Sequence, residues 1–379
     1  MAEQLVISSD SHVVEPPNLW TDRMNPKFSD RIPHLEKGDP YDQWFCDSHP
    51  ISTLGAFSAA GKRFSAPQTI DLDGRFDDVP AGGYDPTAHI NDLAIDGVYA
   101  DVLYPSIGLG LFGIPDPVLI NDVFSAYNDW LSEFCSAYPD RLKGVAMILA
   151  EPTNIETAVA ELRRCTEIGL VGAMISVYPS PGMYYDSPSY DPFWAAAQEL
   201  NMPVSLHVST NRPGSVEHNV NAGMPSQSGA DRSNSDHWVR MSLSHLVLGG
   251  VFERFPALKV VNVEHELSWM LYWIKRMDLT YVERTTQTPH RFDNDMLPSD
   301  FVRRNIYHSF QEDDIGIQFR DMIGVDSLMW ASDYPHAEAT FPESQRILSE
   351  ILEGVPQKER NQIVGGNCAR MYGFSLNGG

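Results

Sequence analysis

The sequence predicts an α/β fold in which parallel strands and helices alternate around a barrel, with long loop insertions at its mouth. Two observations carry this prediction. Short apolar runs rich in Val, Ile and Leu alternate with amphipathic segments about eight times, and parallel neighbouring strands require helical crossovers of this kind. Four of the runs also end in an Asp or His side chain, and the carboxyl ends of barrel strands converge on one mouth.

The first predicted strand is the run Leu5-Val6-Ile7-Ser8-Ser9, which leads into Asp10-Ser11-His12. Residues 16–90 then lack sustained periodicity and carry many Pro, Gly, Asp and Phe residues, so we expect an insertion over the barrel mouth. The pattern becomes regular at residue 87. It predicts helices over 87–97, 117–138, 154–168 and 192–201, and strands over 98–105, 142–149, 171–177 and 203–207.

A second insertion follows the 203–207 strand. Residues 209–235 are rich in Ser, Asn and Gly, and Arg212, His218 and Arg232 are their conspicuous polar side chains. Beyond it the pattern predicts helices over 236–255, 268–283, 313–323, 342–352 and 357–372, and strands over 258–265, 305–310 and 327–333. There is no internal repeat or interdomain linker, so residues 1–379 are expected to form a single domain.

The charge balance narrows the classes of partner. The chain has 51 acidic and 27 basic residues, a net charge of −24, which disfavours binding to nucleic acid or to anionic membranes. No apolar run reaches the roughly 18 residues of a membrane span, and residues 1–20 do not resemble a signal peptide. The four cysteines lack CxxC spacing, so we expect reduced thiols and a cytoplasmic protein.

Asp10 and His12 stand two residues apart in an extended run, which places both side chains on one face. Carboxylate oxygens and imidazole nitrogens are common ligands of divalent metals. Asp and Ser also cap helices and begin turns, so this motif alone fits either role. Three further runs end in a candidate ligand, at His207, at His265 and at Asp333. Together the four strand ends predict a metal site at the barrel mouth.

Other polar residues near these strand ends are candidates for catalysis. Within Glu264-His265-Glu266 the alternation of a strand lets only every second side chain face inward, so either His265 or Glu264 is expected in the site. Asp333 is a candidate ligand or general base, because Pro335 makes a helix-capping role awkward.

Two histidines and two arginines complete the candidate set. His336 and His308 are expected to contact the substrate or to orient Asp333. Arg212 and Arg232 are candidates to clamp a substrate carboxylate, with solvated loop positions as the alternative.

Several motifs resemble a known family. They are Ser9-Asp10-Ser11-His12-Val13-Val14-Glu15-Pro16, the segment Phe252-Glu253-Arg254-Phe255-Pro256-Ala257-Leu258-Lys259-Val260-Val261, Ser268-Trp269 ahead of Arg276-Met277-Asp278, and Ser332-Asp333-Tyr334-Pro335-His336. Together they resemble the amidohydrolase-related (amidohydrolase 2) family of the amidohydrolase superfamily, in the branch that contains 2-amino-3-carboxymuconate-6-semialdehyde decarboxylase. The resemblance covers essentially the whole chain except the two insertions.

The resemblance implies a distorted (β/α)8 TIM barrel with a divalent metal at its C-terminal mouth. Asp10, His12, His207 and Asp333 correspond to the metal ligands, and His265 falls near a histidine that decarboxylase relatives use as an acid or base. The usual first motif of the superfamily is His-x-His, whereas this chain has Asp10-x-His12.

The resemblance also bears on the number of metal ions. Residues 175–177 lack the lysine that bridges two metals in binuclear relatives. We therefore expect one ion of Zn, Mn or Fe, and a binuclear site only if Glu264 or His265 ligates.

Two reactions use this ligand set. The first is hydrolysis of an amide, ester, lactone or thioester, with Asp333 accepting a proton from metal-activated water. The alternative is non-oxidative decarboxylation of an unsaturated or aromatic acid, and a catalytically inactive binding protein is a second alternative. The sequence favours hydrolysis, while a carboxylate clamp by Arg212 and Arg232 would favour decarboxylation. Apolar residues within 16–90 and the family precedent predict a homodimer or higher homo-oligomer.

Overall fold

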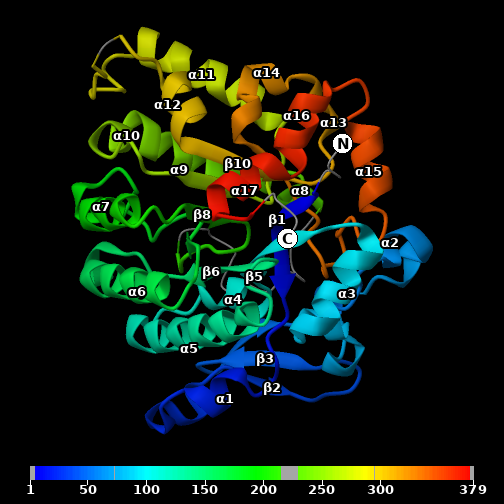
Figure 1. The fold of residues 1–379 in the computed structure, drawn as a ribbon. Helices are drawn as coiled ribbons and strands as arrows, with labels where there is room; N and C mark the ends of the chain where they lie inside the picture. Colours follow the sequence, from blue (N-terminus) through cyan, green and yellow to red (C-terminus); the bar gives the residue numbers. More distant parts are fainter. Residues whose placement is uncertain (1–4, 72, 215–228, 294, 376–379) are drawn as a thin grey trace.

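Figure 1 shows the computed structural model of the chain, which describes residues 5–71, 73–214, 229–293 and 295–375. Eight strands form one sheet in the order β1-β5-β6-β7-β8-β9-β10-β11, and its neighbouring strands pair in parallel. The sheet curves into a nearly closed barrel, so the predicted fold class is confirmed. Its strands are β1 (Ile7–Val13), β5 (Ala100–Pro105), β6 (Leu142–Met147), β7 (Gly172–Ile175), β8 (Val204–His207), β9 (Val260–Val263), β10 (Ile306–Phe310) and β11 (Leu328–Trp330).

The barrel closes at its mouth, where the chain leaving β11 meets β1. No strand pairing of β11 with β1 appears among the described residues. Instead the backbone N–H of Asp333 donates to the carbonyl of Asp10 at 2.9 Å, and the N–H of His12 donates to the carbonyl of Tyr334 at 2.6 Å. The seam of the barrel is therefore made by residues of the predicted metal site.

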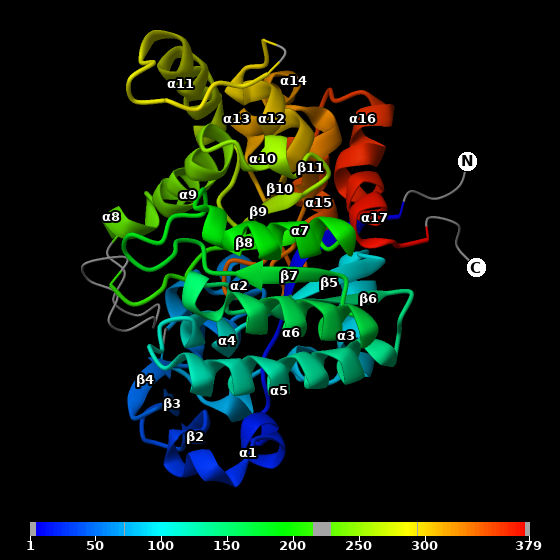
Figure 2. The same ribbon diagram turned by 90° about the vertical axis from the view of Figure 1, so that its left-hand side faces the viewer.

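Helices surround the sheet (Figures 1 and 2). They are α3 (Pro86–Asp96), α4 (Ile107–Leu111), α5 (Pro117–Ser136), α6 (Ile155–Glu167), α7 (Asp191–Glu199), α8 (Gly229–Arg232), α9 (Asp236–Leu248), α10 (Val251–Arg254), α11 (Trp269–Glu283), α12 (Pro298–Asn305), α13 (Asp314–Gln318), α14 (Arg320–Ile323), α15 (Ser344–Ile351), α16 (Gln357–Asn361) and α17 (Asn367–Tyr372). The helix α17 packs against β1. No helix in the described residues is long and apolar enough to span a bilayer.

The main differences from the predicted elements occur where strands and helices end. The strands predicted over 258–265 and 327–333 stop earlier, at Val263 and Trp330. The helix predicted over 236–255 is two helices, because Gly250 adopts a left-handed backbone with φ 72°. The predicted helix over 313–323 is likewise split into α13 and α14, and α12 was not predicted.

Residues 16–90 contain more regular structure than the sequence predicts. They hold the short helices α1 (Leu19–Arg23) and α2 (Lys62–Ser65) and a three-stranded antiparallel sheet of β2 (His34–Glu36), β3 (Gln43–Cys46) and β4 (His49–Ser52). The strands are too short to show a clear period of two. At the barrel mouth the carbonyl of Ala56 accepts from the N–H of Ala337 at 2.7 Å, and the Phe57 ring lies 4.9 Å from the His336 ring.

Large apolar side chains of this insertion pack within their own chain. Trp44, Leu54 and Phe57 are almost fully buried, and Tyr84 at 37% is the one large apolar side chain of residues 16–71 and 73–90 that counts as exposed. Our reason for expecting a partner surface here was therefore wrong. The homo-oligomer stays a prediction that rests on the family resemblance.

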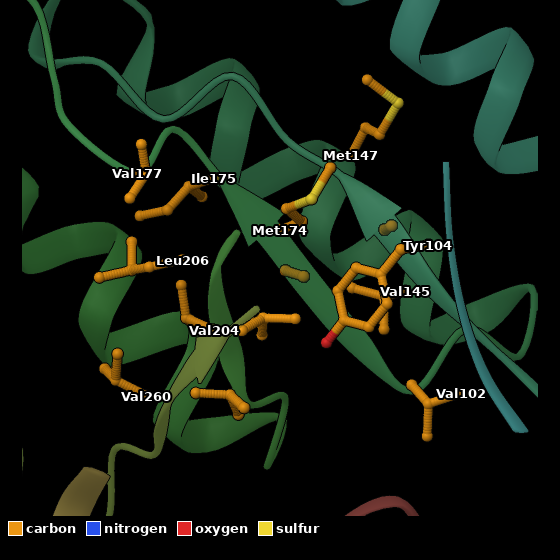
Figure 3. Packing of buried hydrophobic residues seen from close by; sticks show 14 of the residues in the cluster. Val102, Tyr104, Val145, Met147, Met174, Ile175, Val177, Val204, Leu206 and Val260 are labelled. Atoms are coloured by element: carbon orange, nitrogen blue, oxygen red, sulfur yellow. The ribbon is translucent and has the colours of Figure 1, made fainter. Parts of the chain in front are cut away.

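The core beneath the predicted site is mainly apolar and contains a few buried hydroxyl groups. Val102 and Tyr104 of β5 and Val145 of β6 are fully buried in this core (Figure 3). The Tyr104 hydroxyl lies 2.8 Å from the Ser205 hydroxyl, and its ring centroid lies 5.3 Å from that of His207. Tyr104 thus packs against the candidate ligand His207.

Candidate metal centre and active site

Asp10 and His12 come from an irregular part of β1. The pairing of β1 with β5 shifts between Ser8 and Ser11, and the Ser8 hydroxyl donates to the carbonyl of Asp10 at 2.8 Å. Bulges of this kind redirect side chains beside active sites. The Asp10 Oδ1 and His12 Nε2 atoms end 3.5 Å apart, and both side chains are buried.

The rings of His12 and His207 are both held through Nδ1. His12 Nδ1 lies 2.8 Å from the carbonyl of Pro105, and His207 Nδ1 lies 2.9 Å from the carbonyl of Val208. A carbonyl oxygen can only accept, so each Nδ1 carries a proton and each neutral ring has its lone pair on Nε2. This orientation by a backbone carbonyl is typical of metal-ligating histidines.

Four polar atoms converge from β1, β8 and the segment after β11. His12 Nε2 lies 3.2 Å from Asp333 Oδ1, and His207 Nε2 lies 3.6 Å from Asp10 Oδ1. Within the described residues none of these four buried atoms has a hydrogen-bond partner. Buried polar atoms are rarely left unpaired, and two imidazole nitrogens with two carboxylate oxygens suit a divalent cation. The predicted ligands therefore fit the metal that the family resemblance implies.

Two further side chains extend this cluster. Glu264 Oε2 lies 3.5 Å from His207 Nε2, and His336 Nδ1 lies 3.0 Å from Asp333 Oδ1. Asp10, His12, His207 and Glu264 form one group whose atoms could share an ion, and His12, Asp333 and His336 form a second. The two groups overlap at His12.

Charge in this cluster is poorly balanced without a cation. Burial raises the pKa of the Glu264 carboxyl well above its usual range, and the charges of Asp333 and Asp10 raise it further. Burial opposes a charge on His12, but Asp333 and Asp10 outweigh it and raise the His12 pKa to about 9. Without a metal, protons on Glu264 and His12 offset the negative charge of the cluster. A divalent metal would take the place of these protons.

The chain after β9 brings three polar residues into the site together. Because β9 ends at Val263, the alternation that we applied to Glu264 and His265 no longer holds there. Glu264 and Glu266 have φ values of 61° and 56°, in the left-handed region that non-glycine residues seldom occupy. All three residues Glu264, His265 and Glu266 consequently line one cavity.

This cavity has a volume of about 340 Å³ and opens beside the metal cluster. His265 is 4% exposed, and neither of its ring nitrogens has a hydrogen-bond partner in the described structure. Burial, with the nearby His207, lowers its pKa to about 3, so the ring is neutral. The lining residues are Val208, Ser209, Arg232, Ser233, Ser235, Asp236, Glu264, His265, Glu266, Ser268, Trp269, Gln311, Asp313 and Glu338.

Ser106 and Glu15 support the site and were not predicted. The Ser106 hydroxyl donates to the carbonyl of Val13 at 2.7 Å and lies 2.9 Å from His336 Nε2. A hydroxyl has one proton, so Nε2 of His336 donates to Ser106 and Nδ1 presents its lone pair towards Asp333. Two lone pairs 3.0 Å apart repel unless a cation lies near them, which again fits a metal here.

Glu15 fixes the position of Ser106. Its carboxylate accepts from the backbone N–H groups of Ser106, Ile107 and Gly108 at 3.3, 2.9 and 2.9 Å. Burial raises the pKa of Glu15 to about 7, against the effect of these N–H donors. Ser106 could have been predicted as a site residue, because it is a polar residue directly after a strand, at the position where other strands carry candidate ligands.

The remaining predicted residues lie in different places. Arg232 lines the cavity and forms an ion pair with Glu338. Arg212 is buried outside the cavity lining, where Nε donates to Glu151 at 2.8 Å and the guanidinium also donates to backbone carbonyls. His308 is buried in β10, where burial lowers its pKa to about 3, and it belongs to neither ligand group. His218 lies outside the described residues.

Comparison with known proteins identifies the family of the chain. The family model described as amidohydrolase matches residues 64–374. The chain is 24% identical over 355 residues to 2-amino-3-carboxymuconate-6-semialdehyde decarboxylase of Dictyostelium discoideum, covering 91% of this chain and 89% of that protein. It is 33% identical over 158 residues to gamma-resorcylate decarboxylase of Rhodococcus jostii (strain RHA1), a match that spans 39% of this chain and less than half, 46%, of that relative.

Solved structures share the fold over the full length. A crystal structure of an amidohydrolase from Mycobacterium avium subsp. paratuberculosis K-10 superposes with a TM-score of 0.77 at 20% identity, covering 100% of both chains. A dihydroxybenzoic acid decarboxylase from Polaromonas sp. JS666, with bound manganese and the inhibitor 2-nitroresorcinol, superposes with a TM-score of 0.63 at 18% identity, covering 100% of this chain and 98% of that one.

Proposed function

This chain belongs to the amidohydrolase family, and from that premise we propose that it is a metal-dependent decarboxylase of an unsaturated or aromatic carboxylic acid. The observation that carries the proposal is the pairing of a buried metal-ligand cluster with a neutral, unpartnered His265 in the adjoining cavity. The relatives named above as decarboxylases support it. Hydrolysis, which the sequence favoured, has less support from them.

Asp10, His12, His207 and Asp333 would hold the metal, with Glu264 as a further ligand. When bound, a divalent cation supplies a Lewis acid that orients the carboxylate and hydroxyl oxygens of the substrate. Both imidazoles present Nε2 because backbone carbonyls hold their Nδ1 atoms. The cluster would thereby hold the carboxyl end of the substrate beside the cavity.

The reaction breaks the bond between the carboxyl carbon and its neighbour, releases carbon dioxide and places a proton on the carbon left behind. His265 is the group we assign to this proton transfer, because it lines the cavity and its ring nitrogens have no hydrogen-bond partner in the described structure. Its low pKa means that a proton reaching the ring is passed on readily. Asp333 and His336, which lie 3.0 Å apart in the metal cluster and outside the cavity lining, would supply further acid and base groups.

Arg232 is the better placed of the two predicted carboxylate clamps, since it lines the cavity. Arg212 lies outside that lining and pairs with Glu151, while Arg232 would have to leave its ion pair with Glu338 to bind a carboxylate. Manganese is the metal we favour, because the decarboxylase from Polaromonas binds it. Zinc and iron suit the same ligands.

Hydrolysis is the second candidate function. Asp333 Oδ1 has no hydrogen-bond partner among the described residues and stands where it would accept a proton from a water in the site. This geometry serves hydrolysis as well as it serves metal binding.

Product analysis separates the two reactions. Protein loaded with Mn²⁺, Zn²⁺ or Fe²⁺ would be tested on a panel of aromatic and unsaturated acids, with esters, lactones and thioesters in parallel. We expect carbon dioxide from at least one acid and loss of that activity after chelation. Hydrolysis of a neutral carbonyl compound without carbon dioxide from any acid would overturn the proposal and favour the second candidate.

A further inference from the structure

Four serines take the place of strand pairing where the chain after β11 meets β1. Ser8, Ser9 and Ser11 lie on β1, and Ser332 follows β11 closely in the sequence. All four side chains are fully buried. Their hydroxyls make hydrogen bonds across the seam, where β1 and β11 do not pair in the described structure. Three of the four join the segments that carry candidate metal ligands.

Ser8 is the centre of this network. Its hydroxyl donates to the carbonyl of Asp10 at 2.8 Å and accepts from the backbone N–H of Ser332 at 2.9 Å. Its oxygen also lies 3.0 Å from the hydroxyl oxygen of Ser11, which in turn lies 2.9 Å from that of Ser332. Ser332 is therefore tied to β1 twice, once through its backbone and once through its side chain.

The direction of these hydrogen bonds follows from the number of protons available. A carbonyl oxygen only accepts, so the single hydroxyl proton of Ser8 goes to Asp10. Ser11 must then donate to Ser8, and Ser332 must donate to Ser11. The three hydroxyls form one chain of donors that ends on the Asp10 carbonyl. The hydrogen bonds of such a chain polarise and strengthen one another.

This hydroxyl chain joins two segments that supply ligands from opposite sides of the seam. Ser8 and Ser11 bracket the irregular part of β1, where its pairing with β5 shifts. Ser332 directly precedes Asp333, whose φ of 59° lies in the left-handed region. A non-glycine backbone in that region persists only where its surroundings hold it. The chain therefore helps to set how Asp333 approaches the ligands of β1, including the 3.2 Å between its Oδ1 and His12 Nε2.

Ser9 shows what a seam hydroxyl does when it does not touch these segments. Its oxygen lies 2.8 Å from the hydroxyl oxygen of Ser309, and it donates to the carbonyls of Met329 and Trp330 at 3.2 and 3.0 Å. These partners lie within β10 and β11, before the strand ends that carry ligands. The Ser9 hydroxyl thus closes the same seam, but none of its hydrogen bonds in the described structure reaches a candidate ligand.

We propose that Ser8 is a positioning residue of the metal centre, and that the hydroxyl chain from Ser332 through Ser11 to Ser8 sets the affinity of the site for Mn²⁺. The inference depends on the metal binding proposed above and not on the reaction that the metal supports. Loss of the Ser8 hydroxyl would take one hydrogen bond each from the Asp10 carbonyl, the Ser332 N–H and the Ser11 hydroxyl. The two ligand-bearing segments could then move apart.

Metal binding without substrate tests this proposal. Full-length protein would be stripped with a chelator, dialysed and titrated with Mn²⁺, and free Mn²⁺ would be measured by its electron paramagnetic resonance signal. Ser8→Ala should raise the dissociation constant about tenfold or more, the scale on which groups that orient metal ligands act. Ser8→Thr keeps a hydroxyl and should recover part of the affinity.

Ser9→Ala is the matched control. Both alanine substitutions remove one buried hydroxyl from the same strand and the same seam, so thermal unfolding without metal should show a similar loss of stability for the two. Only Ser8→Ala should weaken Mn²⁺ binding. Equal Mn²⁺ affinities of the two variants, whether both are unchanged or both are reduced, would mean that Ser8 only stabilises the fold and would overturn the proposal.

Ser11→Ala covers the case in which Ser8→Ala does not fold. It removes the middle of the hydroxyl chain but keeps the bonds of Ser8 to Asp10 and Ser332. We expect a smaller increase of the dissociation constant than in Ser8→Ala, again with no such increase in Ser9→Ala. An unchanged affinity in Ser11→Ala would remove the chain from the metal centre.

The outcomes also separate this inference from the proposed function. Mn²⁺ binding that depends on Ser8, without carbon dioxide release from any acid, would keep the inference and remove the decarboxylase. Carbon dioxide release by a protein whose Mn²⁺ affinity does not respond to Ser8→Ala or Ser11→Ala would do the reverse. The absence of Mn²⁺ binding by the unsubstituted protein would overturn this inference together with our choice of manganese.

Discussion

The candidate site is built from two kinds of position, and they differ in how the backbone holds them. Asp10, His12 and His207 stand inside strands. Glu264 and Asp333 follow the last residue of β9 and β11, with φ values of 61° and 59°. The strand positions are set by the barrel itself, whereas the others depend on local turns.

This difference suggests a division of labour. Strand-borne side chains cannot move without disturbing the barrel, so they suit a metal that needs fixed ligands. Side chains beyond the strand ends can adjust to a substrate and suit proton transfer and recognition. Variants in the first region should lose the metal, whereas a variant in the second region that keeps an oxygen ligand should keep the metal and lose turnover.

The largest effect is expected for His207→Ala. Removing one imidazole from the strand-borne set should lower bound metal at least tenfold and reduce activity to background, while the fold survives. Metal analysis after gel filtration and circular dichroism would measure both. His49→Ala, at an exposed position on β4, is the control and should keep its metal. Full metal content in His207→Ala would remove this residue from the ligands.

Asp333→Asn should give the next largest loss. The amide keeps the size and one oxygen ligand but removes basicity, so we expect substantial metal retention with turnover lower by about a hundredfold or more. The exposed Asp321→Asn serves as the matched control. Near-native turnover in Asp333→Asn would show that this residue moves no proton, and complete loss of metal would place it with the strand-borne ligands.

His336→Ala should cost less, about ten- to a hundredfold in turnover with the metal retained, the usual range for a residue that orients a ligand. Its Nε2 donates to Ser106, its Nδ1 lies 3.0 Å from Asp333 Oδ1, and its ring stacks on His12 at 3.8 Å.

Ser106→Ala removes only one of these supports and should lower turnover several-fold, with Ser106→Thr restoring the hydroxyl and most of the rate. A Ser106→Ala enzyme as impaired as His336→Ala would mean that the hydroxyl itself contacts the substrate.

The smallest effect concerns stability at Glu15. The folded-state pKa of this carboxyl is about 7, above its ordinary value of 4.5. The folded protein therefore binds this proton more tightly than the unfolded chain does. This proton therefore stabilises the folded state fully below pH about 4.5, and the stabilisation is lost as the pH rises through 7. The free energy of unfolding falls by roughly 3 kcal/mol at most over this range.

Glu15→Gln cannot titrate and isolates this contribution. The free energy of unfolding of the natural protein, relative to the variant, should fall between pH 5 and pH 8. Urea unfolding of both proteins, saturated with the same metal, would show it. A difference that stays constant across this range would mean that Glu15 is ionised throughout.

The sequence predicted the strand positions of the site better than the positions beyond the strand ends. Asp10, His12 and His207 were predicted because they stand at the ends of apolar runs that indicate strands, and the barrel follows from the same runs. The alternation stops at Val263, so it could not show that Glu264, His265 and Glu266 all reach the cavity. Ser106 and Glu15 act through backbone contacts between β1 and β5 that no local pattern encodes. The assignment of site roles remains a prediction that the variants above would test.

The seam between β11 and β1 has a consequence for synthesis of the protein. The N–H of Asp333 bonds to Asp10, and the N–H of His12 bonds to Tyr334, so the beginning and end of the barrel are joined at the metal ligands. A ribosome releases the first ligands long before the last strand exists. A nascent chain therefore cannot complete its ligand set, and metal loading and catalysis both have to wait until translation has passed β11.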